Sequence, residues 1–167
     1  MDKATLHKLS SGLYIIGAKD KARNVGCVVN TVTQSTSSPV TLTVCINKEN
    51  FTNECIKKTG EFTVSILSEQ VARNTIALFG FSSGRDKEKF TNVPYATTES
   101  GLPYLSEGVC GYLQCKVIDC ISIFTHNIYV AEVLEAELLS AETPLTYDYY
   151  HRVLKGKTPP KASSYQA

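Results

Sequence analysis

The order of its short β-type segments restricts the fold of this chain more than any other feature of the sequence. Runs rich in Val, Ile, Thr and Tyr, several of them alternating apolar with polar residues, predict half-buried strands. They cover residues 13–18, 25–30, 40–47, 62–67, 111–123 and 127–139. Two helices are predicted in the middle of the chain, over residues 50–60 and 67–80, each ending at a glycine.

This order favours an antiparallel sheet. Strands and helices do not alternate along the chain, which disfavours a doubly wound parallel sheet, whereas a closed or nearly closed antiparallel barrel with packed helices fits. The 167 residues amount to about one domain and contain no internal repeat or dividing linker. Residues 155–167, rich in Pro, Ser and Lys, are predicted to form an extended arm or a frayed terminus.

The charge balance argues against polyanionic partners. Seventeen basic and sixteen acidic residues leave a formal net charge of +1, so no overall field attracts nucleic acid or an anionic membrane. No apolar run approaches the ~20 residues that cross a bilayer, and the N-terminus lacks the basic-then-apolar order of a signal peptide. We therefore expect a cytoplasmic protein with no nucleic-acid or membrane partner.

The six cysteines do not form a recognisable metal or redox motif. No C-x-x-C pair occurs, so neither a zinc ribbon nor a thioredoxin-type motif is indicated. Cys110, Cys115 and Cys120 are spaced by five, which in a strand sends successive side chains to opposite faces. We expect most cysteines to be buried thiols and no metal to be bound, although a turn within this segment would reopen a soft-metal site.

Three polar clusters carry the ligand-binding signal. Nearly every residue from 30 to 38 has a hydroxyl or an amide, which suits the edge of a planar heterocycle. Residues 46–52 lie at an expected helix start, where free N–H groups favour phosphate, and residues 79–90 add basic and hydroxyl side chains. Each cluster alone is more often a turn, a helix cap or a solvated surface; their combination favours a nucleotide-like ligand. No G-x-S-x-G, H-E-x-x-H, P-loop or G-x-G-x-x-G motif competes with this interpretation.

Three sequence blocks carry a family resemblance. The blocks GCVVNTVTQSTSSPVTLTVCINKENFTNECIKKTGEFTVSIL, IALFGFSSGRDKEKF and HNIYVAEV resemble the flavin reductase-like proteins with an FMN-binding split barrel. Within that family the chain is most similar to the flavoredoxin and NADH:flavin oxidoreductase branch, which includes the flavin domain of rubredoxin-fused proteins. The resemblance implies a mostly β fold, an antiparallel, Greek-key-like split β-barrel over residues 1–154, followed by the arm at 155–167.

The same resemblance implies the cofactors and the residues that hold them. FMN would be bound, with NADH or NADPH as co-substrate; the first cluster would face the isoalloxazine ring or ribityl chain, and the second would hold the phosphate. The cofactor-binding residues so implied are Asn30, Thr31, Gln34, Ser37, Asn47, Lys48, Asn50, Thr52, Ser83, Arg85 and Lys89. His126 is the catalytic candidate, positioned to supply a proton or positive charge near the ring. The alternative is an interior histidine satisfied by backbone carbonyls.

The implied activity is that of an NAD(P)H-dependent flavin oxidoreductase. Hydride would pass from NAD(P)H to FMN, and electrons would leave to a separate acceptor, because no cysteine pairs of a rubredoxin module are present. That acceptor would be free flavin, a rubredoxin-like protein or an iron centre. A homodimer is expected, in which the loop around residues 82–86 or the segment 149–152 completes the neighbour's pocket. A ferric reductase, a non-enzymatic FMN carrier and a split-barrel module for another ligand are the alternatives, and the sequence does not distinguish NADH from NADPH.

Overall fold

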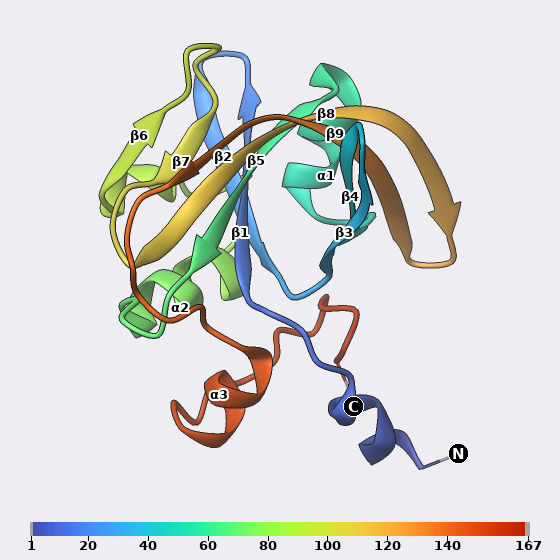
Figure 1. The fold of residues 1–167 in the computed structure, drawn as a ribbon, viewed down its shortest axis with the longest axis vertical. Coiled ribbons are helices and arrows are strands. Elements are labelled where there is room, and N and C mark those ends of the chain that lie inside the picture. The colour runs from blue at the N-terminus through green and yellow to red at the C-terminus, as the bar shows by residue number, and fades with distance from the viewer. Residues whose placement is uncertain (1, 166–167) are drawn as a thin grey trace.

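The computed structural model describes residues 2–165. Within them, seven strands form one antiparallel sheet in the order β2-β1-β5-β8-β9-β4-β3 (Figure 1). The strands of this sheet are β1 (Tyr14–Asp20), β2 (Arg23–Val29), β3 (Val32–Ser37), β4 (Val40–Asn47), β5 (Glu61–Leu67), β8 (Val109–Ile123) and β9 (His126–Leu138). The antiparallel, mostly β fold expected from the sequence is confirmed.

Helices cover the two ends of the sheet. Helix α1 (Phe51–Thr59) starts at the N-cap Asn50, whose side chain accepts a hydrogen bond from the Thr52 N–H, and it ends at Gly60 with φ 73°, the left-handed value that glycine adopts without strain. The other helical elements are α2 (Arg73–Phe81), α3 (Tyr147–Arg152) and the short 3-10 helices η1 (Lys3–Lys8) and η2 (Phe90–Asn92). A separate hairpin pairs β6 (Tyr95–Thr97) with β7 (Pro103–Leu105).

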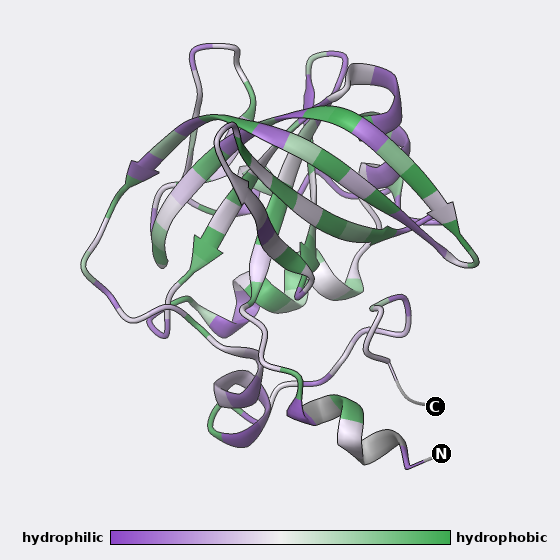
Figure 2. Ribbon diagram, turned by 45° about the vertical axis from the view of Figure 1, so that its right-hand side comes forward, coloured by the Kyte–Doolittle hydropathy of each residue, from purple (hydrophilic) through white to green (hydrophobic). Residues whose placement is uncertain are grey.

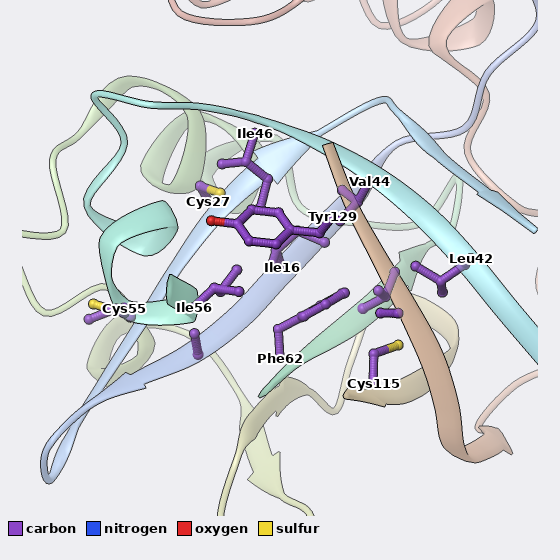
Figure 3. Packing of buried hydrophobic residues seen from close by; sticks show 14 residues of the cluster. Ile16, Cys27, Leu42, Val44, Ile46, Cys55, Ile56, Phe62, Cys115 and Tyr129 are labelled. Atoms are coloured by element: carbon purple, nitrogen blue, oxygen red, sulfur yellow. The ribbon is translucent and has the colours of Figure 1, made fainter. Parts of the chain in front are cut away.

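The sheet curls into a barrel that stays open along one side. Its two edge strands, β2 and β3, follow each other in sequence and are joined by Asn30 and Thr31, yet they do not pair within the described residues. The interior holds a core that includes Phe62 and Tyr129, both fully buried, with α1 packed beside it (Figure 3). Burial of these large aromatic side chains supplies much of the hydrophobic driving force.

A second core lies where α2 and α3 meet the barrel. Phe79 and Phe90 pack edge to face, with ring centroids 5.0 Å apart, and Tyr147 and Tyr150 of α3 join the same cluster. The Leu13 N–H donates to the carbonyl of Leu145 at 3.0 Å, which ties the segment before α3 to the start of β1. This cluster fixes the two tyrosines at the open side of the barrel.

The structure corrects several element assignments. Residues 32–37, expected as a polar loop, form the edge strand β3 because their Thr-rich run pairs with β4 over residues 40–44. Helix α2 begins at residue 73 rather than 67, since residues 61–67 continue as β5, and it passes through Gly80 to Phe81. The β6–β7 hairpin and α3 were not predicted; their segments are too short to show a period.

The cysteines lie mostly in the interior, as expected. Cys27, Cys55, Cys110 and Cys115 are buried, Cys45 is half-buried and Cys120 is exposed. Burial raises the pKa of Cys27 to about 11 and that of Cys115 to about 12, so both stay thiols at neutral pH. Among residues 2–165, no three His, Cys, Asp or Glu side chains gather as a metal site, and no helix in that range is long and apolar enough to cross a membrane.

Candidate functional site

A pocket opens where the unpaired edge of the barrel meets α2, α3 and the C-terminal arm. We call it the barrel pocket. Aliphatic and aromatic side chains form most of its wall, with neutral polar groups and one histidine between them. Its lining residues are Leu13, Val28, Val29, Asn30, Thr31, Cys45, Ile46, Asn47, Asn50, Ile76, Phe79, Gly80, His126, Tyr147, Tyr150, Pro159, Lys161, Ala162 and Ser163.

Five residues predicted from the sequence meet in the barrel pocket: Asn30, Thr31, Asn47, Asn50 and His126. The antiparallel pairing of β4 with β9 places Asn47 opposite His126, so residues far apart in sequence become neighbours. Thr31 reaches β4 through its hydroxyl, which donates to the Cys45 carbonyl at 2.9 Å. The pocket therefore gathers neutral donors and acceptors from the link between β2 and β3, from the end of β4 and from the start of β9.

His126 is held by partners on two sides. Its Nδ1 lies 2.8 Å from the Thr125 hydroxyl, and its ring also hydrogen-bonds the backbone carbonyl of Lys161 in the C-terminal arm. Burial lowers the pKa of His126 below its usual value; the hydrogen bond to the Lys161 carbonyl opposes this shift, and the charge of Lys48 adds to it. The imidazole is therefore neutral at pH 7 and gains its charge only in acid.

The C-terminal arm, residues 155–165, closes the barrel pocket from outside. The Tyr147 hydroxyl lies 2.7 Å from both the Thr158 and Ser164 hydroxyls, and the Tyr150 hydroxyl donates to the Lys157 carbonyl at 3.1 Å. Asn30 exchanges longer hydrogen bonds with the arm's serines. The free volume left inside the pocket is about 50 Å³, room for a few waters.

A second pocket adjoins the first at the start of α1. We call it the outer pocket; its free volume is about 420 Å³. Ser82, Ser83 and Gly84 line it from the loop after α2, and Glu49 lines it from the turn before α1. The two pockets share the wall residues Asn50, Phe79, Gly80, Pro159 and Lys161, so they lie side by side, separated by these residues.

The three predicted anion-binding cations are engaged elsewhere. Lys48 donates to the Phe124 carbonyl at 2.6 Å. Arg85 pairs with Glu54 and lies 4.9 Å from the centroid of the Phe51 ring. Lys89 is 3% exposed and donates to the carbonyls of Gly26 and Phe79; burial lowers its pKa. Each cation holds loops or strands together, and none of them lines either pocket.

The remaining predicted residues are spread over different surroundings. Ser83 lines the outer pocket. Gln34 and Ser37 are exposed on β3, and Gln34 lines a shallow groove between β3 and β9 instead of the barrel pocket. Thr52 is buried, and its hydroxyl has no hydrogen-bond partner in the described part of the chain. The side chains of Gln34 and Ser37 face solvent because β3 is an edge strand that is exposed along nearly its whole length.

Sequence reasoning missed Tyr147 and the arm, and it expected the segment 149–152, which contains Tyr150, to complete the pocket of a neighbouring chain. Tyr147 and Tyr150 reach the pocket from α3, and Lys161 reaches it from a segment that was expected to extend or fray. The Y-D-Y-Y-H-R run offered one signal, since its aromatic side chains need burial somewhere. Nothing in the sequence indicated that this run would lie beside residues 30 and 126 of its own chain.

A buried polar network holds α1 against β9 below the site. Asn53 is 2% exposed, and its side-chain oxygen accepts hydrogen bonds from the Asn127 amide at 2.8 Å and the Tyr129 hydroxyl at 2.6 Å. Its own amide donates to the Lys48 carbonyl at 3.2 Å. The turn that carries Asn47 and Asn50 is thereby fixed to the strand that begins with His126.

The comparison with protein families identifies one domain over nearly the whole chain. The family model described as "Flavin reductase like domain" matches residues 6–155. The matched range includes the barrel, α1, α2, α3 and every polar residue of the barrel pocket except those of the C-terminal arm.

Relatives of high similarity extend the match across the arm. The chain is 42% identical over 165 residues to the high molecular weight rubredoxin of Moorella thermoacetica, covering 99% of this chain and 72% of that protein. It is 39% identical over 165 residues to the ferric-chelate reductase (NAD(P)H) of Archaeoglobus fulgidus, covering 99% and 98%. Among solved structures, the NADH:FAD oxidoreductase of Streptomyces globisporus has the same fold, with TM-score 0.77 at 20% identity over 87% of this chain and 88% of that chain.

Proposed function

The chain belongs to the flavin reductase-like family, and on that premise we propose that it is an NAD(P)H-dependent flavin oxidoreductase that uses FMN. The single observation that carries this proposal is the convergence of Asn30, Thr31, Asn47, Asn50 and His126 on one pocket with an aromatic wall. A flat, polar-edged, apolar-faced ligand such as an isoalloxazine ring matches such a lining.

The donor set agrees with the chemistry of a flavin. The ring's edge offers carbonyl oxygens and ring nitrogens, which neutral amides and hydroxyls recognise without burying a charge. Asn30, Thr31 and Asn47 supply such groups, while Tyr147 and Tyr150 supply faces for stacking. We propose that these five residues surround the ring, and that Gln34 and Ser37 contribute only through a neighbouring chain.

The outer pocket is the proposed place of the ribityl phosphate. Ser82 and Ser83 line it beside Asn50 at the start of α1, where the positive end of the helix dipole favours an anion. The buried, unpartnered hydroxyl of Thr52 lies one residue inside the same helix. Lys48, Arg85 and Lys89, which the family resemblance assigned to the cofactor, would stabilise the surrounding loops rather than touch the phosphate.

When bound, the flavin supplies the redox chemistry, accepting hydride from a nicotinamide and passing electrons onward. The protein holds the ring, excludes water and controls charge at the ring edge. We propose that His126 does the last of these, as a hydrogen-bond donor when neutral and as a cation in acid, with Thr125 holding its Nδ1. The aromatic wall formed by Phe79, Tyr147 and Tyr150 keeps bulk water from one side of the site.

We expect the purified, FMN-reconstituted protein to lose its oxidised-flavin absorbance when NADH or NADPH is added without oxygen. The physical reason is that a nicotinamide stacked on the ring delivers hydride directly, with no further cofactor required. The measurement is an anaerobic visible spectrum recorded before and after each coenzyme is added. The coenzyme that reduces the flavin absorbance faster is the preferred one.

Two other results would contradict this proposal in different ways. A flavin band that forms and persists after both coenzymes would point to a non-enzymatic FMN carrier. Absence of any bound flavin would leave a split-barrel module for another ligand. Boiled protein mixed with FMN and NADH serves as the control for direct reduction of free flavin.

The proposed electron acceptor is a separate molecule. Ferric chelate is the first candidate, because the Archaeoglobus relative named a ferric-chelate reductase spans the same length at 39% identity. Free flavin and a small rubredoxin-like iron protein are the others, the latter suggested by the Moorella relative named a rubredoxin. The bleached protein would be reoxidised fastest by its true acceptor.

A homodimer is proposed from the projecting β8–β9 hairpin. Its outer half leaves the barrel (Figure 1) and carries apolar bands along both strands (Figure 2). Ile121, Ile123 and Phe124 are exposed there, Phe124 to 93%. Exposed apolar strands of this kind mark protein interfaces.

We expect light scattering to give the mass of two chains for the wild-type protein. Ile121→Asp should lower the measured mass toward that of one chain, because it places a charge in the apolar surface. A single-chain mass for the wild type would exclude the dimer.

A further inference from the structure

The arm cannot stay where it is if the barrel pocket is to hold a ring. With residues 158–164 in place, the pocket keeps about 50 Å³ of free volume, whereas ligand pockets usually measure about 300–1,000 Å³. The walls contributed by β2, β4 and β9 are parts of one continuous sheet and cannot retreat. The arm, by contrast, is held by hydroxyl and amide hydrogen bonds at its margin.

The arm also carries the cation best placed to meet a ligand phosphate. Among the described residues that line the barrel and outer pockets, Lys161 is the only lysine or arginine, and it lines both. The predicted alternatives, Lys48, Arg85 and Lys89, are engaged with a carbonyl, a carboxylate and two buried carbonyls. An anion entering the outer pocket therefore meets the positive charge of Lys161 among its described lining residues.

The present partner of Lys161 is easily replaced. Its Nζ lies 2.9 Å from a Glu49 carboxylate oxygen, and the side chains are 56% and 74% exposed. The ammonium group lowers the pKa of Glu49 mainly through this hydrogen bond. Exposed pairs of this kind contribute little to stability, and a phosphate monoester carries more charge and more acceptor oxygens than a carboxylate.

We propose that Lys161 is a ligand-binding residue of this site. Lys161 pairs with Glu49 while the arm covers the pocket, and it pairs with the phosphate of FMN instead of Glu49 when FMN is bound. The inference rests on the proposed function, because it needs a flavin in the barrel pocket. It adds the C-terminal arm to the binding site. The Glu49 carboxylate then competes with the FMN phosphate for Lys161. Movement of the arm also releases His126 from the Lys161 carbonyl.

The test compares FMN with riboflavin, which lacks the phosphate. Lys161→Gln should weaken FMN binding about 10- to 100-fold, the scale of a lost charge-assisted hydrogen bond, and leave riboflavin binding unchanged. Lys161→Arg should restore most of the FMN affinity. Lys157→Gln, which removes a charge from an exposed position of the same arm whose backbone carbonyl alone is used, is the matched control and should bind both flavins as the wild type does. Dissociation constants come from flavin fluorescence, so no activity is needed.

Each other result has a definite meaning. Equal losses for both flavins, or no loss for either, would overturn the role of Lys161 while leaving the proposed function intact. An unchanged FMN-to-riboflavin ratio combined with lost discrimination between NADPH and NADH would assign Lys161 to the coenzyme and overturn its assignment to FMN. Weaker FMN binding by Glu49→Gln would overturn the exchange, and failure of the wild type to bind either flavin would remove this inference together with the proposed function.

Discussion

Replacing Asn53 with alanine should lower the free energy of unfolding by about 3 kcal/mol, the largest loss of stability that we expect from a single polar side chain here. The substitution leaves the buried Asn127 amide without its partner, and it leaves the Tyr129 hydroxyl with only its 3.2 Å bond to the backbone carbonyl of residue 53. A buried group without a partner costs about 1–3 kcal/mol, and the loss of a buried side chain adds the cost of a cavity. The present bonds of the Tyr129 hydroxyl and the Asn127 amide to the Asn53 side chain measure 2.6 and 2.8 Å. Urea unfolding followed by tyrosine fluorescence gives the difference from the shifted midpoint at constant slope.

Tyr129→Phe is the matched control for this network. It removes the hydroxyl itself and leaves Asn53 bonded to Asn127, so we expect a loss nearer 1 kcal/mol. A loss for Asn53→Ala no larger than that of the control would show that the network does not hold α1 to β9. Because the same network fixes the turn bearing Asn47 and Asn50, flavin binding should weaken in Asn53→Ala more than in Tyr129→Phe.

Replacing His126 with glutamine should slow reduction of the bound flavin by about 100-fold in acid, within the usual range for a proton-donating side chain, without releasing FMN. Burial lowers the pKa of His126, so the ring is neutral at pH 7 and becomes charged only as the pH falls below about 6.5. A cation at the ring edge favours the negative charge that reduction places there. The wild-type rate should therefore rise as the pH falls, and the variant's rate should stay flat.

Stopped-flow reduction by NADH across this pH range separates the two roles of His126. Glutamine keeps an N–H donor but cannot gain a proton, so a merely structural histidine would leave the shape of the pH profile unaltered. If the pH dependence of the reduction rate is the same in the variant as in the wild type, His126 is an interior histidine that is hydrogen-bonded to a backbone carbonyl and has no role in reduction. The FMN dissociation constant, measured on the same samples, controls for loss of the cofactor.

The sequence predicts the sheet better than it predicts the site. Runs rich in Val, Ile, Thr and Tyr, several of them alternating with polar residues, identified six of the strands, because such residues are typical of buried and half-buried strands. The same reasoning failed at residues 32–37, where polar residues form an exposed edge strand. Such a strand buries too few side chains to show a pattern of apolar residues, so its sequence cannot be distinguished from that of a polar loop.

The positions of some predicted site residues follow from backbone structure that is fixed locally. Asn50 caps a helix and Asn47 ends a strand, and both positions follow from nearby residues. Long-range packing brings Tyr147, Tyr150 and Lys161 into the pocket. No short sequence motif predicts packing of this kind. The partners of the basic residues could not be predicted, because a sequence does not show whether a lysine bonds a ligand or, like Lys89, carbonyls of its own chain.

The pairing of β4 with β9 has a consequence for the order in which the segments of this protein fold. It joins residues 41–47 to residues 126–132, and the arm that covers the site lies still later in the chain. Contacts between such distant segments form slowly, since a long loop must close first. The pocket therefore cannot form on a nascent chain until residues 126–132 and the arm have left the ribosome, and a flavin can be captured only after these segments have folded onto the barrel.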